Sequence, residues 1–338
     1  MAVGEAVSYL AAARALAHAR SIAVTTHLNP DGDGIGSQLA LLHALEGLGK
    51  QVRVLSPSVV SRTYAFLPGF ERIEVVADPA QAAAIGMVDV LISCDAGDLQ
   101  RLGATALIRR ATLINLDHHI TNTRFGTINL VDVSGESSGV VVERLLRRLK
   151  VPLDQRLGEC LYTTIVFDTG RFMHSNTTAH TFSWTARLLK TGIDAASINR
   201  CLTYTRTLHD LAIQRLGIDH LVVDAQEPSL AGISLSADEI RAVGEPQDWG
   251  DLVELPRTLA GNQIAYLMRE SKNRDSVRCS LRSNPPFEVG SVASIFGGGG
   301  HLQAAGCTIP GTLSSARDCL LPLLRRQLTI GTSGACHG

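Results

Sequence analysis

The sequence predicts an α/β protein: a doubly wound, mostly parallel sheet, followed by a smaller α/β domain with a mixed sheet. Two observations support this prediction. In the first half of the chain, short apolar runs alternate with helical segments, which is typical of parallel sheets covered by helices. In the last third, apolar residues alternate with polar ones along the runs, which is typical of a sheet with one face in water.

The length of the chain, 338 residues, favours two domains. Its 45% hydrophobic residues suffice to build a core in each. Mixed charge between Cys201 and Gln214 predicts a connecting segment at that point. We therefore expect a first domain over residues 1–195, a connecting linker or helix over 196–215, a second domain over 216–330 and a tail over 331–338.

Composition argues against several classes of protein. A net charge of −1 provides no basic field to hold a long nucleic acid, so a nucleic-acid partner is expected to be short. Seven cysteines without a C-x-x-C pair indicate buried, reduced thiols rather than disulfides or a zinc site. No window resembles a membrane span, and the alanine-rich N-terminus carries Glu5, Arg14 and Arg20, unlike a signal peptide. We expect a soluble, cytoplasmic protein with no membrane partner.

The first domain is expected to begin with a helix over residues 3–19, because alanine and leucine have strong helix propensity. Apolar, β-branched runs then predict strands over residues 22–26, 51–55, 73–76, 88–94, 112–116 and 127–131. The run at 88–94 is nearly all apolar, as in a strand buried on both faces. Helices are expected over residues 39–48, 139–150, 157–167 and 179–190, with another from residue 195.

A polar segment directly after the first strand carries the strongest chemical signal. Within seven residues it offers one imidazole and two carboxylates, from His27, Asp31 and Asp33. A proline and three glycines, spaced among and after them, let the backbone wrap closely around a ligand. These side chains are ligands for divalent metals, although such an Asn-Pro-Asp-Gly-Asp-Gly run is also typical of an ordinary surface turn. Further ligands elsewhere in the chain decide between the two interpretations.

Polar residues also follow other predicted elements. Asp95 follows one buried strand, and the triplet Asp117-His118-His119 closes the next. Asp168 ends a predicted helix. A lone aspartate at such a position is often a strand-end or helix-cap residue. Because ligands of parallel sheets bind beyond the carboxyl ends of the strands, several such groups at one edge instead predict a shared metal site.

The second domain is expected to contain strands over residues 218–224, 230–235, 263–268 and 276–281, and a helix over 237–243. Two of its segments are suited to an anion. One strand ends in Ser280 and the guanidinium of Arg282, which binds phosphate or carboxylate well; a surface ion pair is the alternative for Arg282. The loop Gly297–His301 contains four glycines, whose bared backbone N–H groups can bind an anion. A plain linker is not expected there, because four glycines are entropically costly.

Together these motifs resemble the DHH phosphoesterase superfamily, named for the triplet at residues 117–119, and most closely its NrnA-type branch of bacterial oligoribonucleases and phosphoadenosine-phosphate (pAp) phosphatases. The matching motifs span most of the chain. In order they are His27-x-x-Pro30-Asp31-x-Asp33 with Gly36-Ser37, Asp95, the triplet, Asp168-Thr169-Gly170, Ser280–Ser283, and Gly297–His301 with Ala304–Gly306. The last two resemble the DHH-associated C-terminal domain. Gly34 departs from the family's commonest form, in which alanine is frequent, but this removes no ligand.

The resemblance implies a site for two divalent ions, usually Mn²⁺, with Mg²⁺ or Co²⁺ as alternatives. The implied ligands are His27, Asp31 and Asp95 for the first ion, and Asp33, Asp95, His118 and Asp168 for the second, with Asp95 bridging. Asp117 would orient a ligand histidine. His119 would lie on the substrate side, touching the scissile phosphate or helping the leaving oxygen; simple packing beside the metals is the alternative.

The resemblance also implies a hydrolase. We expect a phosphodiesterase that cleaves short oligoribonucleotides (nanoRNA, dinucleotides such as pApA), 3′,5′-bisphosphonucleotides such as pAp, or both, by water activated between two metal ions. The active site is expected in the cleft between the domains. There the nucleotide would be held by Ser280, Arg282, Gly298, Gly299, Gly300 and His301. A long duplex is not expected as a partner. Family members are often homodimers, and the sequence leaves the oligomeric state open.

Other functions stay open at this point. An inorganic pyrophosphatase of the DHH type shares the first four motifs, although the glycine loop favours a nucleotide. A long-strand exonuclease of the RecJ type is less favoured, because the chain lacks extra domains and a basic excess. A non-catalytic sensor of cyclic dinucleotides or other nucleotides would use the fold without turnover, but the intact ligand set argues against it. The sequence ranks neither the substrates nor the direction of digestion, and it does not identify the metal used in the cell.

Overall fold

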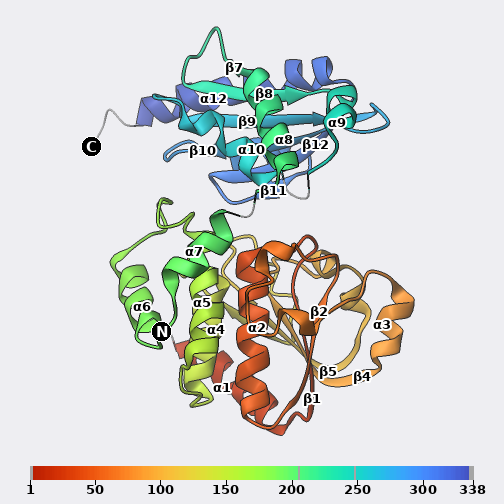
Figure 1. Ribbon diagram of the computed structural model, residues 1–338, viewed down its shortest axis with the longest axis vertical. Helices are drawn as coiled ribbons and strands as arrows, with labels where there is room; N and C mark the ends of the chain where they lie inside the picture. The colour runs from red at the N-terminus through yellow and green to blue at the C-terminus, as the bar shows by residue number, and fades with distance from the viewer. Residues whose placement is uncertain (1–2, 205, 247–248, 335–338) are drawn as a thin grey trace. The chain divides into compact units, whose positions relative to one another are not determined.

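The computed structural model describes residues 3–204, 206–246 and 249–334. The chain divides into two compact units, which we describe separately: unit 1 (Met1–Thr205) and unit 2 (Arg206–Gly338) (Figure 1). The boundary falls inside the segment predicted to connect the domains. Most of that segment is helical, because it contains most of α7 (Ala195–Thr203) and the first part of α8 (Leu208–Asp219). Helix α7 packs on the core of unit 1, and α8 packs on a core of unit 2. The predicted tail begins within the last helix, and residues 335–338 lie outside the described part of the chain.

Unit 1 is built on a six-stranded parallel sheet in the order β3-β2-β1-β4-β5-β6, which confirms the predicted fold class. The strands are β1 (Ser21–Thr25), β2 (Gln51–Ser56), β3 (Ile73–Val75), β4 (Met87–Cys94), β5 (Arg109–Asp117) and β6 (Ile128–Val131). All six were expected from the apolar runs. Because the chain starts in the middle of the sheet and builds outward in both directions, β1 and β4 meet at the point where the strand order reverses. Ligands bind beyond the carboxyl ends of the strands at such a point.

Helices cover both faces of this sheet. One core lies between the sheet and α1 (Val3–His18), α2 (Gly32–Gly47), α4 (Ser138–Arg148) and α5 (Gln155–Asp168), and α6 (Ala179–Leu189) packs against α5 (Figure 1). The other core lies under α3 (Pro79–Ile85) and the 3-10 segment η3 (Leu99–Leu107). Successive residues of β1 alternate between the two cores: Ile22 and Val24 join the first, and Ala23 joins the second. The sheet is therefore buried on both faces, as its apolar runs predicted.

Helix α2 begins earlier than predicted, inside the segment expected to form a turn. Asp31 caps it by accepting hydrogen bonds from two backbone N–H groups. A Cβ atom on Gly34 would lie 2.3 Å from Thr26 Oγ1, and one on Gly36 would lie 2.5 Å from the carbonyl oxygen of Cys160. These glycines therefore let α2 approach β1 and α5 closely. They do not wrap a turn around a ligand, and that part of the prediction was wrong.

Unit 2 contains a mixed sheet, as predicted. It has six strands in the order β11-β12-β10-β9-β8-β7, of which β11 and β12 were not expected from the sequence. The strands are β7 (Leu221–Val223), β8 (Leu230–Leu235), β9 (Ile264–Glu270), β10 (Ser276–Ser283), β11 (Gly299–Gly300) and β12 (Ala304–Pro310). Only β8 and β9 pair in parallel; the other neighbours are antiparallel. Buried residues alternate with less buried ones along β10, which is the pattern expected of a half-exposed strand.

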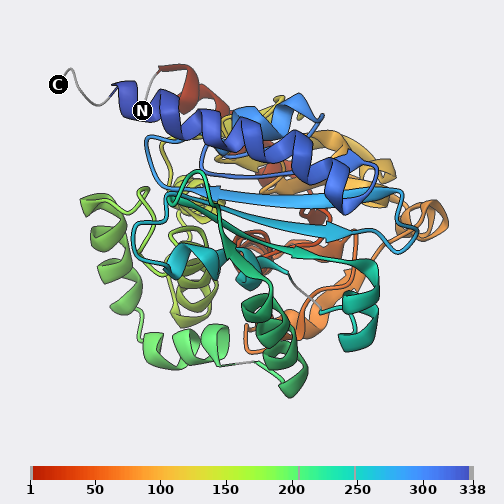
Figure 2. The ribbon, with the colours of Figure 1, turned by 90° about the horizontal axis from the view of Figure 1, so that it is seen from above.

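Two cores lie on opposite faces of this second sheet. Helices α11 (Val289–Ile295) and α12 (Leu313–Gly334) cover one face, and α8, α9 (Ala237–Val243) and α10 (Gly250–Glu254) cover part of the other (Figure 2). The sequence indicated α9 but neither α11 nor α12. Pro322 lies inside α12, where proline normally ends a helix, so the periodic pattern was interrupted. Packing of Leu320, Leu324 and Leu328 into the core compensates for it.

Two further expectations concern the thiols and the membrane. The six cysteines within the described residues are free; Cys94, Cys160, Cys279 and Cys307 are buried, whereas Cys319 is exposed. The reduced state of these cysteines agrees with the prediction. The predicted burial is confirmed for Cys94, Cys160, Cys279 and Cys307. Within the same residues, no helix combines the length and the apolar character that crossing a bilayer requires.

Candidate metal centre

The first group of ligand atoms gathers at the carboxyl ends of β1 and β4. His27 Nε2 lies 3.5 Å from Asp31 Oδ2 and 3.4 Å from Asp95 Oδ2. The other ring nitrogen, Nδ1, lies 2.7 Å from the carbonyl oxygen of Leu28, which makes Nδ1 a donor and turns Nε2 toward the carboxylates. Only 3% of His27 is exposed. One ring nitrogen and two carboxylates thus converge on one small volume.

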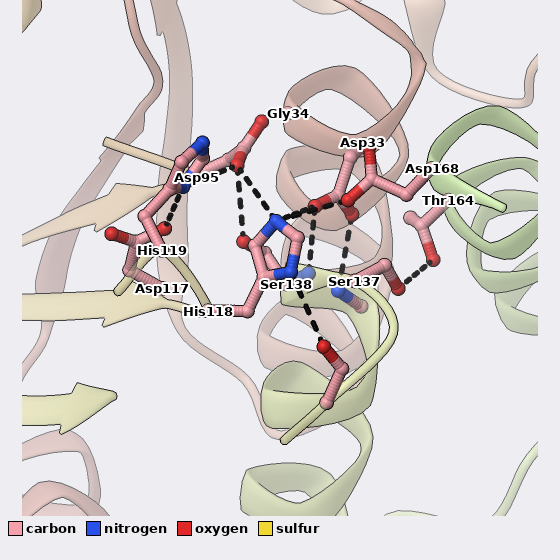
Figure 3. Close-up of polar contacts among 12 residues, drawn as sticks. Asp33, Gly34, Asp95, Asp117, His118, His119, Ser137, Ser138, Thr164 and Asp168 are labelled. Atoms are coloured by element: carbon pink, nitrogen blue, oxygen red, sulfur yellow. Dashed lines mark hydrogen bonds and ion pairs between the residues drawn. The ribbon is translucent and has the colours of Figure 1, made fainter. Parts of the chain in front are cut away.

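The second group shares Asp95 with the first, and Figure 3 shows its residues. His118 Nε2 is 2.9 Å from Asp168 Oδ2, 3.8 Å from Asp33 Oδ2 and 3.8 Å from Asp95 Oδ1. His118 Nδ1 lies 3.3 Å from the carbonyl oxygen of Gly135, so the chain again directs Nε2 toward carboxylates. These residues come from α2, from α5 and from the positions directly after β4 and β5, which explains why segments far apart in sequence supply one site.

Asp95 belongs to both groups, because Oδ2 faces His27 and Oδ1 faces His118. Its backbone has a φ of 56°, a left-handed conformation that non-glycine residues rarely adopt. The N–H of Asp95 donates to the carbonyl oxygen of Leu116 (2.9 Å), which ties the exit of β4 to β5. Backbone strain of this kind is often retained where it places a functional side chain. One carboxylate is therefore held where it can bridge two cations.

Asp33 is held by the start of α4. Its Oδ2 accepts the backbone N–H of Ser138 (2.6 Å) and its Oδ1 accepts that of Gly139 (3.2 Å). Unpaired N–H groups at a helix N-terminus stabilise negative charge, so this fully buried carboxylate has a built-in partner. A Cβ atom on Gly139 would lie 2.0 Å from Thr164 Oγ1, which shows how closely α4 and α5 approach at this point.

The cluster concentrates negative charge. Burial, followed by the charges of neighbouring carboxylates, raises the pKa of Asp33 well above its usual range and also raises that of Asp168. Burial alone would lower the pKa of His27, but Asp31 and Asp95 outweigh it and raise that pKa to about 10. The carboxylates thus keep protons on the site unless another positive charge replaces them.

These residues fit divalent metal ions. Among the described residues, two buried ligand atoms, His27 Nε2 and Asp168 Oδ2, find no hydrogen-bond partner although each faces other ligand atoms. The candidate atoms of His27, Asp31 and Asp95 lie within 4.8 Å of one another, and so do those of Asp33, His118 and Asp168, close enough in each case to share one ion. Carboxylate oxygens combined with imidazole nitrogens suit Mn²⁺ and related divalent ions. All six residues predicted as metal ligands lie together in these two groups.

The third residue of the triplet is held by the first. Asp117 Oδ1 accepts a hydrogen bond from His119 Nδ1 at 2.7 Å (Figure 3). We expected Asp117 to orient a ligand histidine, but its bond goes to His119, because the side chains of His118 and His119 leave the strand end in different directions and His118 turns toward Asp168. Asp117 is fully buried, whereas 14% of the His119 side chain is exposed. The pair therefore forms one wall of the site.

Two residues that the sequence analysis did not single out also contact the site. Ser138 holds Asp33 through its backbone and donates from Oγ to Asp95 Oδ1 (3.3 Å). Asn122 donates to Asp117 Oδ2 (2.5 Å). The serine stands at the start of a predicted helix, which is a signal for an anion-holding terminus. The asparagine stands in a turn, where asparagine is common for other reasons, so no sequence signal marked it.

In unit 2, Arg282 already has a partner. Its Nε donates to Glu254 Oε1 (2.9 Å), and its Nη1 donates to the carbonyl oxygen of Leu281 (3.0 Å). Arg257 binds the other oxygen of the same carboxylate at 2.6 Å. This is the ion pair weighed above as the alternative for Arg282. Ser280 lies next to Arg282 on the same face of β10, half-buried.

The glycine segment of unit 2 is a small hairpin. Gly299 and Gly300 form β11 and pair with β12. The backbone N–H groups of Gly297, Gly298 and His301 donate to carbonyl oxygens of unit 2 itself, so the prediction that this loop bares its N–H groups was wrong at these positions. A Cβ atom on Gly298 would lie 2.1 Å from the carbonyl oxygen of Gly306. Close backbone packing thus accounts for this glycine.

Comparison with known proteins agrees with this geometry. Residues 21–165 match the family model described as the DHH family, N-terminal domain, and residues 233–328 match the DHHA1 domain. A protein of Thermus thermophilus, named bifunctional oligoribonuclease and PAP phosphatase NrnA, is 31% identical over 310 residues, which is 91% of this chain and 90% of the relative. A protein of the same name from Bacillus subtilis is 25% identical over 86% of this chain and 89% of the relative.

The fold has a close counterpart among solved structures. An exopolyphosphatase-related protein from Bacteroides fragilis matches with a TM-score of 0.87 and 25% sequence identity, over 97% of this chain and 98% of that chain. Both units are therefore shared, in the same order, with the curated relatives and with a solved structure. The chain belongs to the DHH phosphoesterase family, with a DHHA1 domain in its C-terminal unit.

Proposed function

We propose that this protein is a metal-dependent phosphoesterase that hydrolyses short oligoribonucleotides and 3′,5′-bisphosphonucleotides such as pAp. The observation that carries the proposal is the position of Asp95, whose two carboxylate oxygens face two separate groups of ligand atoms. The relatives support the same reaction class, because their names cite oligoribonuclease and PAP phosphatase activities.

We assign the ligands of two ions from the two groups. His27, Asp31 and Asp95 would hold one, and Asp33, Asp95, His118 and Asp168 would hold the other. Mn²⁺ is the ion we propose, with Mg²⁺ or Co²⁺ as alternatives, because the ligands mix oxygen with imidazole nitrogen. Ions bound there supply Lewis acidity that activates water and neutralises charge on the reacting phosphate.

The protein holds these groups in place before a substrate arrives. The carbonyl oxygen of Leu28 fixes the ring of His27, and the start of α4 fixes Asp33, so the ligands need little reorganisation. Asp117 accepts the Nδ1–H of His119, which turns the second ring nitrogen away from Asp117. We propose that this second nitrogen contacts the scissile phosphate or the leaving oxygen.

Substrate recognition is assigned to unit 2 as part of the same proposal. Its nucleotide-binding residues would be Ser280, Arg282, Gly298, Gly299, Gly300 and His301. Arg282 would share its guanidinium between Glu254 and a phosphate, which its several donors allow. The net charge of −1 supports a short substrate over a long strand. A cytoplasmic location is proposed as well, supported by the free cysteines among the described residues.

The test is hydrolysis of a 5′-labelled RNA ladder, with pAp and pyrophosphate in parallel, in the presence of Mn²⁺ or EDTA. Asp95→Asn serves as the blank. We expect turnover of pAp and of the shortest RNAs, lost with EDTA and in the blank. Cleavage of pyrophosphate alone would instead support a DHH-type pyrophosphatase. Binding of dinucleotides without release of any product would indicate a sensor.

A further inference from the structure

Asn122 lies beside the triplet, in the connection between β5 and β6, and uses both hydrogens of its side-chain amide. One is donated to Asp117 Oδ2 at 2.5 Å. The other is donated to the carbonyl oxygen of Ala96 at 3.1 Å. Ala96 directly follows Asp95, so one amide group ties the residue that begins the triplet to the segment that carries the shared carboxylate.

The carbonyl oxygen of the same side chain also has two partners. Asn122 Oδ1 accepts from Asn115 Nδ2 at 3.1 Å and from the backbone N–H of Arg124 at 2.6 Å. Reversing the amide would place its oxygen against Asp117 Oδ2 and the Ala96 carbonyl, so acceptors would face acceptors. The four contacts therefore select one orientation of the side chain, in which the donors point to Asp117 and Ala96.

The fixed orientation of the Asn122 side chain also determines the direction of the His119 ring, through Asp117. Asp117 is a fully buried carboxylate with one oxygen toward Asn122 and the other toward His119 Nδ1. A carboxylate held at one oxygen cannot rotate without losing that bond, so its second oxygen stays aimed at the imidazole. Partners of this kind fix both the tautomer and the direction of a histidine ring. Asn122, Asp117 and His119 thus form a chain of contacts in which each member orients the next.

We propose that Asn122 is a positioning residue for His119, acting through Asp117. The proposal rests on the proposed function, in which His119 contacts the reacting phosphate. Loss of the asparagine frees Asp117 to turn, and His119 then loses its fixed direction, whereas Asp95 keeps the hydrogen bond from its backbone N–H to Leu116. The expected consequence is a lower kcat with little change in KM, because alignment of His119 counts mainly in the transition state.

The sharpest variant is Asn122→Asp, which keeps the size of the side chain but sets a carboxylate against Asp117 and the Ala96 carbonyl. Asn122→Ala removes the same two donors without adding charge and replaces the Asp variant if that variant fails to fold. We expect kcat to fall by about 10- to 100-fold in either variant, with KM within about threefold of wild type. A KM effect as large as the kcat effect would overturn the positioning role.

Asn129→Ala is the matched control. Asn129 lies in the next element, β6, and exchanges two hydrogen bonds with Gly126: its Oδ1 accepts the N–H at 2.9 Å, and its Nδ2 donates to the carbonyl at 2.7 Å. It clamps the other end of the same connection without contacting Asp117. We expect a similar drop in Tm for Asn129→Ala and Asn122→Ala, but kcat within about twofold of wild type for the control. Equal losses of kcat in both would mean that the connection acts only as a structural support.

The direct readout is the Nδ1–H proton of His119 in protein labelled with ¹⁵N-histidine and loaded with diamagnetic Mg²⁺, assigned with His119→Gln. We expect a low-field, slowly exchanging signal in wild type and in Asn129→Ala, and its loss in both Asn122 variants. An unchanged signal in the Asn122 variants would overturn the proposal. If the signal behaves as expected but wild type hydrolyses none of the substrates, the positioning role stands and the proposed function fails.

Discussion

The two units treat their candidate site residues in opposite ways. In unit 1, carboxylates and imidazoles face one another, and two buried ligand atoms have no hydrogen-bond partner within the described part of the chain. In unit 2, the candidates are already bonded within the protein: Arg282 to Glu254, and the N–H groups of Gly298 and His301 to nearby carbonyl oxygens. The first arrangement is stable only when protons or cations offset its negative charge, whereas the second is stable by itself.

This difference shows which kind of motif indicates chemistry most directly. Buried polar groups normally find partners, so a buried acceptor that faces other acceptors requires a missing positive charge. Glycines have a second explanation, namely close backbone approach, and Gly298 and Gly300 both need it: a Cβ atom would lie 2.1 Å and 2.4 Å from a carbonyl oxygen, respectively. The candidate metal centre of unit 1 therefore leaves charge to be offset by a ligand, whereas Arg282 of unit 2 already has a partner in Glu254.

The largest effect is expected for Asp95→Asn. Because Asp95 faces both ligand groups, its loss weakens both ion sites, and we expect kcat to fall by about 10³-fold, equivalent to about 4 kcal/mol of transition-state stabilisation. Asp31→Asn, which touches only the first group, is expected to cost less. Steady-state kinetics at saturating Mn²⁺ measures both. Equal losses in the two variants would remove the special position of Asp95.

Arg282→Ala tests unit 2. If Arg282 binds a substrate phosphate, removing a charge-assisted hydrogen bond raises KM by about 10- to 100-fold. Arg257→Ala is the control, because Arg257 binds the same carboxylate, Glu254, and its loss disturbs the same ion pair. We expect KM of the control to stay within about threefold of wild type. Equal KM values in the two variants would reduce Arg282 to a structural ion pair.

Metal affinity is expected to rise with pH. The pKa of His27 is raised to about 10 in the metal-free site, so at neutral pH the ring carries a proton that a cation must displace. Below that pKa, each displaced proton makes the apparent affinity rise about tenfold per pH unit. Isothermal titration of Mn²⁺ between pH 6.5 and 8.5, in buffers of different ionisation enthalpy, measures the affinity and the protons released. An affinity independent of pH would contradict protonation of the metal-free site.

The smallest effect concerns the packing that positions the ligands. Gly34→Ala places a methyl group 2.3 Å from Thr26 Oγ1, and we expect it to lower the free energy of unfolding by about 1–3 kcal/mol. Gly47→Ala, at the other end of α2, meets nothing within 4 Å and is expected to be neutral or slightly stabilising. Urea unfolding of both variants tests this. A neutral Gly34→Ala would show that α2 can shift without strain.

The parallel sheet and the ligand set could be predicted because both follow from local rules. Apolar runs gave the strands of unit 1, and the ends of parallel strands share one edge, so Asp95 and the triplet were expected to meet. The start of α2 could not be predicted in the same way. Asp31, Asp33 and the glycines favour a turn by local propensity, and only packing against Thr26 and α5 shows why this segment is helical.

The features that the sequence analysis did not predict correctly in unit 2 have a similar cause. Proline inside α12 disrupted the helical pattern, and the N–H groups of the glycine segment were assigned to a ligand because their partners lie in other segments. Asn122 was missed because its importance lies in the combination of four contacts, with Ala96, Asn115, Asp117 and Arg124, which no local pattern marked. The contact with Ala96 joins residues 26 positions apart and is seen only once the chain is folded.

The most direct test is low-temperature electron paramagnetic resonance during titration with Mn²⁺, for wild type and Asp95→Asn. Two ions that share the Asp95 carboxylate should be exchange-coupled. We predict two Mn²⁺ ions per wild-type chain with a coupled spectrum, and loss of the coupling in Asp95→Asn. A wild-type protein that binds a single ion, or two ions without coupling, would contradict the shared two-ion centre.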